Sequence, residues 1–186
     1  GVLSASEVAA LYDNPGSTAP DTTGGDLMAH YDFDEDTVLA PDVSGSGNHI
    51  VHAGNFWGSG PGISLDTIAG AGSVSFDGGS YLTASSNLLA TIARDFSISV
   101  WVKTGQSVGS PGDMAYWGAA IVSADIFTGS AGDAVPIALT AGQVAFNTGD
   151  GSSDETLNSS ATVNDDLWHH LVVTRNQATG VKQIYI

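Results

Sequence analysis

The chain has 186 residues and no Cys, and its 20 Asp and Glu side chains face only 4 Lys and Arg, for a formal net charge of -16. This charge repels phosphate backbones and anionic lipid, so we expect no nucleic-acid partner. The lack of Cys excludes disulfides, thiolate metal sites and a cysteine nucleophile. No apolar run reaches the length of a membrane span, so we expect no membrane insertion.

The first 16 residues predict the only helix longer than two turns. Ser4 and Glu7 have the spacing of a capping box, and Val8 and Leu11 follow at helical spacing. Asn14-Pro15-Gly16 is a helix stop. Residues 17–26 are rich in Pro, Gly, Thr and Asp and read as a linker.

From Leu27 onward the apolar residues alternate with polar ones, as in half-buried strands, and Gly-rich turns separate the segments. We expect strands near residues 27–33, 49–53, 73–77, 80–84, 96–103, 119–124, 135–140, 143–147, 168–174 and 181–186. Many short strands without alternating helices predict an all-β fold, an antiparallel two-sheet sandwich with one short N-terminal helix.

The densest acidic segment is 32–36, and a Gly-rich loop with Asp42 and Asn48 follows it. A helix-loop-helix calcium loop is excluded, because its Gly and final Glu positions hold Thr37 and Val43. Catalysis by two facing carboxylates is disfavoured, because Glu occurs only at positions 7, 35 and 155. A structural Ca2+ site fits the residue types, since carboxylate, amide and carbonyl oxygens bind this ion. We predict as its ligands Asp34, Asp42, Asn48 and Asp77.

Three aromatic side chains lie in Gly-rich loops rather than in strands: Trp57, Tyr116 and Trp117. Exposed rings on loops suit sugar binding, because an aromatic face can stack on the apolar face of a pyranose. Rings that merely cover a sandwich are the alternative. We take these three residues as candidate ligand-binding residues.

Two other motifs have a structural interpretation. His169 and His170 are adjacent on an expected strand, so they point to opposite faces and cannot chelate one ion together. We expect one to be packed and the other solvated. Residues 150–155 are either a second cation loop or a hairpin turn.

Several segments, in their order, resemble concanavalin A-like, laminin-G-like jelly-roll domains over about residues 27–186. The segments that carry this resemblance are 27–35, 42–48, Ser75-Phe76-Asp77-Gly78, Tyr81-Leu82, 96–103, 167–174 and 182–186. The resemblance implies a jelly-roll sandwich. In related domains an acid from the closing strands is also expected at the calcium site.

The resemblance also implies an unusual order at the ends of the chain. Residues 1–16 resemble the helical tail that follows the last strand of such a domain, and 27–186 resemble a domain without its usual closing strands. Three arrangements are open. The chain contains the tail of one repeat and most of the next, or a permuted or split domain, or a domain whose closing strands come from another polypeptide.

The function we expect is that of a non-catalytic, calcium-assisted carbohydrate- or ligand-binding module. It would belong to a secreted or cell-surface multidomain protein, such as a bacterial adhesin. Its partners would be a glycan or cell-surface ligand, neighbouring domains, or a second polypeptide that supplies closing strands. The alternatives are a spacer repeat in an extracellular stalk and a domain related to glycoside hydrolases.

Overall fold

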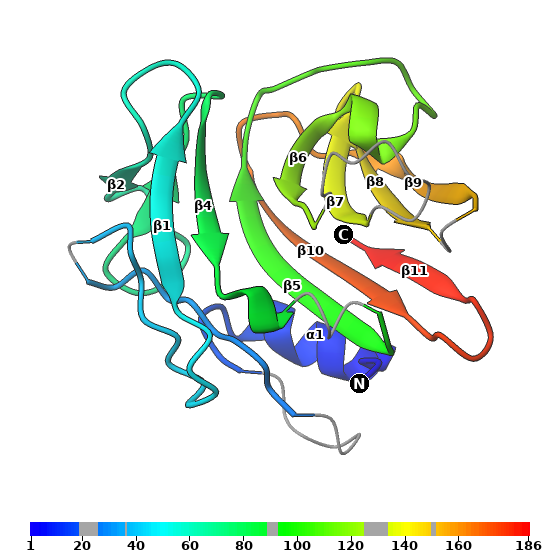
Figure 1. Ribbon diagram of the computed structural model, residues 1–186, viewed down its shortest axis with the longest axis horizontal. Helices are drawn as coiled ribbons and strands as arrows, with labels where there is room; N and C mark the ends of the chain where they lie inside the picture. Colours follow the sequence, from blue (N-terminus) through cyan, green and yellow to red (C-terminus); the bar gives the residue numbers. More distant parts are fainter. Residues whose placement is uncertain (19–25, 36, 89–92, 125–133, 150–151) are drawn as a thin grey trace. The chain divides into compact units, whose positions relative to one another are not determined.

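The computed structural model of the chain describes residues 1–18, 26–35, 37–88, 93–124, 134–149 and 152–186. The chain forms two compact units, Leu3–Ala93 and Arg94–Ile186, each with its own antiparallel sheets (Figure 1). The predicted all-β class with one N-terminal helix is confirmed. The sequence predicted other boundaries, with segments 1–16, 17–26 and 27–186. That division into domains stays a prediction. No described helix is long and apolar enough to cross a membrane.

Helix α1 (Ala5–Asp13) begins at the predicted capping box. The Ser4 backbone N–H donates to Glu7 Oε2 at 2.7 Å, and the Glu7 N–H donates to Ser4 Oγ at 3.4 Å. Val8 and Leu11 are buried, and the helix ends at Asn14. The other helical segments of the described residues are the 3-10 turns η1 (Ser86–Leu88) and η2 (Ala115–Trp117). Most of the predicted linker, residues 19–25, lies outside the described residues.

The first unit contains two strand pairs. β1 (Ile50–Asn55) pairs with β4 (Ser80–Ala84), and β2 (Gly62–Ser64) pairs with β3 (Ser73–Ser75), both antiparallel. The register places Gly54 opposite Tyr81 and Asn55 opposite Ser80. This pairing brings the loop after β1 next to the turn before β4.

The strand predicted at 27–33 is wrong, since these residues form no strand. Their backbone is bonded to a neighbouring loop instead. The His30 N–H donates to Asp42 Oδ1 at 2.9 Å, the Val43 N–H donates to the His30 carbonyl, and Asn48 Nδ2 donates to the Met28 carbonyl at 2.7 Å. Phe33 adopts a φ of 53°, which no strand residue has. Side chains of the 42–48 loop thus form hydrogen bonds that a neighbouring strand would otherwise form with this backbone.

The second unit has two sheets. The order in one is β11-β10-β5 and in the other β6-β7-β8-β9. Their strands are β5 (Phe96–Lys103), β6 (Ala119–Val122), β7 (Val135–Thr140), β8 (Gln143–Gly149), β9 (Asp154–Thr162), β10 (Trp168–Arg175) and β11 (Lys182–Tyr185).

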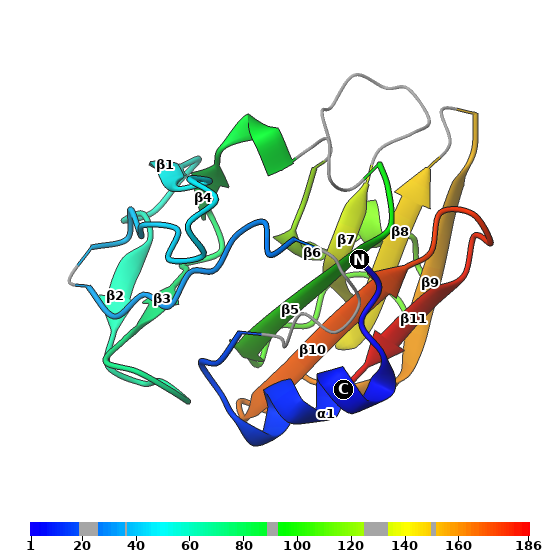
Figure 2. The same cartoon turned by 90° about the horizontal axis from the view of Figure 1, so that it is seen from below.

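The two sheets of this unit lie face to face (Figure 2). The rings of Phe96 on β5 and Phe146 on β8 meet edge to face across the interior, with centroids 5.9 Å apart. Apolar side chains from both sheets are completely buried, as alternating strands of a sandwich require. They include Ile137, Val144, Phe146, Leu171 and Val173.

The prediction that the adjacent histidines point to opposite faces and that one is packed is confirmed, but the other, His169, is half-buried rather than solvated. His170 is 4% exposed, stacks on Trp101 with ring centroids 4.9 Å apart, and lies 2.8 Å from Ser99 Oγ. Burial lowers its pKa. His169 points to the other face, where its Nε2 lies 2.8 Å from Asp165 Oδ1.

For the segment 150–155, the strand pairing supports the hairpin alternative, because Gly149 at the end of β8 pairs with Asp154 at the start of β9. β9 begins at Asp154 and continues for nine residues, while 150 and 151 lie outside the described residues. Strands β2 and β9 were not expected from the sequence.

Candidate functional site

Four aromatic and imidazole rings form a continuous surface at one end of the β1–β4 pair. We call this set, His52, Phe56, Trp57 and Tyr81, the aromatic platform. Phe56 lies 5.1 Å from Tyr81 and 6.1 Å from Trp57, and His52 lies 5.9 Å from Tyr81, all between ring centroids. Phe56 is 75% and Trp57 67% exposed. The protein therefore presents several large apolar rings to solvent in one place.

Gly54 makes room for the platform within β1. A Cβ at this position would lie 2.6 Å from the Cζ and from the hydroxyl oxygen of Tyr81, and 2.9 Å from His52 Nε2. Real Cβ atoms do not approach other atoms so closely. The missing side chain thus lets the Tyr81 ring lie across β1, with its hydroxyl close to the imidazole.

The loop that carries Trp57 is fixed to the turn before β4 by Asp77. Oδ2 of Asp77 accepts hydrogen bonds from the N–H groups of Ser59 (2.7 Å) and Gly60 (3.3 Å), and Oδ1 accepts one from Gly79 (3.1 Å). The Phe56 N–H donates to the Gly79 carbonyl at 2.7 Å. Hydrogen bonds with Ser80 and with these backbone amides lower the pKa of Asp77.

Two glycines allow this close contact between the loop and the turn. Gly58 adopts a φ of 90°, and a Cβ there would lie 2.2 Å from Asp77 Oδ2. A Cβ on Gly79 would lie 2.7 Å from the Trp57 indole nitrogen. The indole therefore rests on the turn.

The platform combines stacking surfaces with polar groups. The ring faces of Phe56 and Trp57 can stack on an apolar ligand face, while the Tyr81 hydroxyl and the His52 imidazole can exchange hydrogen bonds with hydroxyl groups beside it. Binding sites for small polar molecules have this composition of apolar walls and a few placed polar groups.

The other two predicted aromatic residues form a separate pair in the second unit. Tyr116 and Trp117 lie in η2, are 41% and 62% exposed, and meet edge to face with centroids 5.5 Å apart. Within the described part of the chain this pair has no further ring beside it, whereas Phe56 links Trp57 to Tyr81.

Of the predicted calcium ligands, Asp42 and Asn48 come together. Asp42 Oδ1 accepts from the N–H groups of His30 and Ser44, and Oδ2 accepts from that of Asn48, all at 2.9 Å. Both residues are buried. The Asn48 side chain donates to the Met28 carbonyl, and its Oδ1 is buried without a hydrogen-bond partner.

Asp34 and Asp77 bind to other loops. Asp34 Oδ1 accepts from the Ala71 N–H at 2.6 Å, and Asp77 holds the Trp57 loop. Within the described residues, no three His, Asp or Glu side chains are grouped as a metal site would require. The carboxylates of Asp34, Asp42 and Asp77 each accept hydrogen bonds from backbone amides.

Sequence reasoning missed three members of the platform. Phe56 precedes Trp57 in the same loop, and its position beside another aromatic residue was an available signal. Tyr81 and His52 lie on strands, and only the β1–β4 register shows that they adjoin the loop.

The comparisons with known proteins place the chain in a family. A family model described as the concanavalin A-like lectin/glucanases superfamily, Laminin_G_3, matches residues 76–186, more than half of the chain. The match includes Asp77 and Tyr81 and confirms the resemblance seen in the sequence. No curated protein and no solved structure gave a match. The chain belongs to the Laminin_G_3 family of the concanavalin A-like lectin/glucanases superfamily, and its fold is an antiparallel two-sheet jelly-roll sandwich.

Proposed function

We propose that the protein is a non-catalytic module that binds carbohydrate through the aromatic platform. The observation that carries this proposal is the exposure of Phe56 and Trp57 on a loop that Asp77 fixes in advance. A preformed aromatic surface loses little side-chain freedom on binding, so more of the stacking energy remains as affinity. Membership of a superfamily of lectins and glucanases supports the same ligand class.

The ligand we propose is an uncharged glycan. The protein carries a formal net charge of -16, and the Asp77 carboxylate lies directly under the Trp57 loop. Sialylated, sulfated or uronic-acid sugars would be repelled by this field. A neutral pyranose offers an apolar face for Phe56 and Trp57 and hydroxyl groups for Tyr81 and His52.

The positions of the glutamates support a binding rather than a hydrolytic role. Retaining and inverting glycosidases need two carboxyl groups on either side of the scissile bond. Glu7 is bonded to the N-terminus of α1, and Glu155 Oε2 lies 3.8 Å from Lys182 Nζ. None of the three glutamates is among the platform residues, and Asp77, which holds the Trp57 loop, is bonded to three backbone amides.

The test compares two exposed tryptophans on a glycan array. We expect the wild-type protein to bind neutral hexose and N-acetylhexosamine oligosaccharides in preference to sialylated or sulfated ones. Trp57→Ala should weaken binding at least about tenfold, a loss of about 1.4 kcal/mol, because the largest exposed ring of the platform is removed. Calorimetry with the best neutral glycan gives the affinities.

Trp117→Ala is the matched control, because Trp117 is 62% exposed against 67% for Trp57. This variant should bind as the wild type does. Equal losses of affinity in both variants would contradict the platform as the binding site. Preferred binding of anionic glycans would contradict the uncharged ligand proposed for it. No binding to any glycan would favour the spacer role.

We also propose that Ca2+ supports the loop 42–48, with Asp42 and Asn48 as its side-chain ligands. Support comes from Asn48 Oδ1, a buried oxygen without a partner, and from the oxygen-rich residues around it. A cation there would satisfy this oxygen and offset the Asp42 charge.

Millimolar CaCl2 is expected to raise the thermal unfolding midpoint of the chelator-treated protein, because an ion that binds only the folded state stabilises it by mass action. Differential scanning calorimetry measures the shift. Asn48→Ala should abolish it, and the same concentration of MgCl2 should produce a smaller one. An equal shift in the variant would place the ion elsewhere.

The setting we propose is a secreted or cell-surface protein with several domains. Solubility at high negative charge and independence from disulfides suit such a module. A bacterial adhesin is our preferred parent protein.

A further inference from the structure

The two units differ in how their charges are composed. Residues 3–93 contain 11 Asp and Glu side chains and neither Lys nor Arg, whereas all 4 Lys and Arg side chains lie in 94–186. The first unit therefore has no Lys or Arg to offset its carboxylates. Because a field of one sign raises the local concentration of ions of the opposite sign, this unit attracts cations.

One of these carboxylates, that of Asp77, lies beside the aromatic platform. The Gly79 N–H donates to Asp77 Oδ1 at 3.1 Å, and a Cβ on the same glycine would lie 2.7 Å from the Trp57 indole nitrogen. Gly79 thus lies against both the carboxylate and the indole. Hydrogen bonds with the Ser80 side chain and with backbone amides hold the pKa of Asp77 below its ordinary value. The carboxylate is therefore ionised at neutral pH.

The exposed rings of the platform are suitable partners for a cation. The face of an aromatic ring carries the negative part of its quadrupole and attracts a cation within about 6 Å of the ring centroid, most strongly in Trp. Phe56 and Trp57 are 75% and 67% exposed, and their ring centroids are 6.1 Å apart. A single cation can therefore contact both rings.

Asp77 offers a cation its charge rather than free hydrogen-bond acceptors. Its two carboxylate oxygens already accept from the N–H groups of Ser59, Gly60 and Gly79. A primary ammonium or a guanidinium carries N–H donors that need acceptors when they leave water. A quaternary ammonium has no N–H group, and its methyl groups can lie directly on the ring faces. The site therefore favours the quaternary cation.

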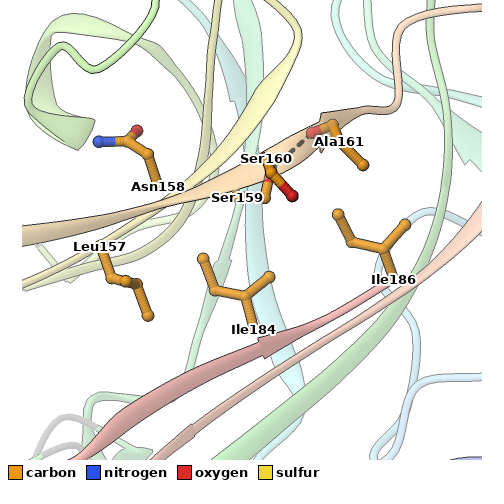
Figure 3. A pocket seen from close by; sticks show the side chains of 7 residues that line it. All are labelled: Leu157, Asn158, Ser159, Ser160, Ala161, Ile184 and Ile186. Carbon is orange, nitrogen blue, oxygen red and sulfur yellow. Dashed lines mark hydrogen bonds between the residues drawn. The ribbon is translucent and has the colours of Figure 1, made fainter.

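The pocket of the second unit offers neither rings nor charge. It has a volume of about 310 Å³, and its lining side chains come from β9, β11 and the residue after β11 (Figure 3): Leu157, Asn158, Ser159, Ser160, Ala161, Ile184 and Ile186. The exposed rings of Tyr116 and Trp117 lie in the unit that holds all the Lys and Arg side chains. Exposed rings and carboxylates without basic neighbours in their unit therefore coincide at the platform.

We propose that the aromatic platform also binds a small, singly charged quaternary ammonium compound of the chemical class of choline. Its trimethylammonium group lies on the faces of Phe56 and Trp57, and the carboxylates of the first unit attract it. This inference goes beyond the proposed function, because it does not depend on sugar binding. An attached phosphate would be repelled by the same carboxylates.

The test compares choline with 3,3-dimethylbutan-1-ol, which has the same shape without the charge. Each compound gives one sharp methyl signal, so saturation-transfer NMR with the full chain measures both affinities in the same way. The neutral alcohol should bind at least about threefold more weakly than choline, because it lacks the cation–π attraction. Phosphocholine should also bind more weakly than choline.

The salt dependence of the wild-type protein tests the electrostatic part of the proposal. Raising NaCl from about 20 mM to about 500 mM should weaken choline binding, because salt screens the carboxylates, and should not weaken binding of the neutral alcohol. This measurement needs no variant and is independent of any effect of a substitution on folding.

Trp57→Ala should lower the affinity for choline at least about threefold, and circular dichroism shows whether it is folded. Trp117→Ala is the matched control and should bind choline as the wild type does. No saturable choline binding, equal binding of choline and either the alcohol or phosphocholine, or equal losses in the two variants would overturn the proposal. Glycan binding without choline binding would overturn this inference alone, whereas choline binding without glycan binding would support it and contradict the proposed function.

Discussion

Replacing Phe146 by alanine is expected to lower the free energy of unfolding of the second unit by about 3–5 kcal/mol. Phe146 is completely buried on β8, and its ring contacts Phe96 of the opposite sheet. The substitution removes this contact between the two sheets and leaves a cavity that a sandwich of rigid strands cannot close. Urea unfolding followed by tryptophan fluorescence measures the loss.

Phe76→Ala controls for the removal of a phenyl ring. Phe76 is 53% exposed in the first unit, so its loss should cost less than about 1 kcal/mol. Phe146→Leu should lie between the two, because it keeps most of the buried volume. If Phe146→Ala and Phe76→Ala destabilised the protein equally, the ring of Phe146 would not be the contact that joins the sheets.

The elements predicted correctly from the sequence have a pattern of apolar residues within the element, whether one face is more buried, as in β5, or both are buried, as in β7. The alternation in 96–103 predicted β5, whose Phe96 packs against Phe146 of the opposite sheet. The helix was predictable because its N-terminal capping is local, between Ser4 and Glu7. In both cases the signal lies within the element itself.

β9, which the sequence did not predict, and 27–33, where a strand was wrongly predicted, have structures that depend on residues distant along the chain. β9 consists largely of Ser, Thr, Asn and Asp, because it ends a sheet and its exposed positions need no apolar residue. Residues 27–33 alternate like a strand, yet their backbone forms hydrogen bonds with the side chains of Asp42 and Asn48. No local sequence pattern reveals these hydrogen bonds.

The candidate site was predictable only in part, for the same reason. Trp57 could be identified as a loop aromatic, but its neighbours His52 and Tyr81 join it through the register of β1 and β4. The carboxylates were recognised as oxygen ligands. The sequence does not show that the N–H groups bonded to Asp34 and Asp77 come from the loops around Ala71 and Ser59.

Asp42→Asn is expected to destabilise the first unit by about 2 kcal/mol at neutral pH and to remove a pH dependence below pH 4. Burial opposes ionisation of Asp42, but hydrogen bonds from Ser44, His30 and Asn48 outweigh it and lower its pKa from 3.8 to about 2. Such a difference in the pKa of Asp42 between the folded and unfolded states contributes about 2 kcal/mol to the free energy of unfolding.

The sign of the pH dependence follows from the lowered pKa. Above pH 3.8 the carboxylate is ionised in both states, and the folded state has the full benefit of its hydrogen bonds. As the pH falls from 3.8 towards 2, the unfolded state takes up a proton first, so this stabilisation is lost. The stability difference between wild type and Asp42→Asn should therefore be largest above pH 4 and shrink towards pH 2.

Urea unfolding of both proteins at a series of pH values measures this difference. Asp13→Asn controls for the removal of one negative charge, because Asp13 is exposed at the end of α1. If the free energies of unfolding of wild type and Asp42→Asn differed by the same amount down to pH 2, the substitution would destabilise the fold through altered packing rather than through the lost charge. A difference that shrinks would show that an ionised Asp42, bonded to three backbone amides, holds the 42–48 loop against residues 28–30 where a strand was expected.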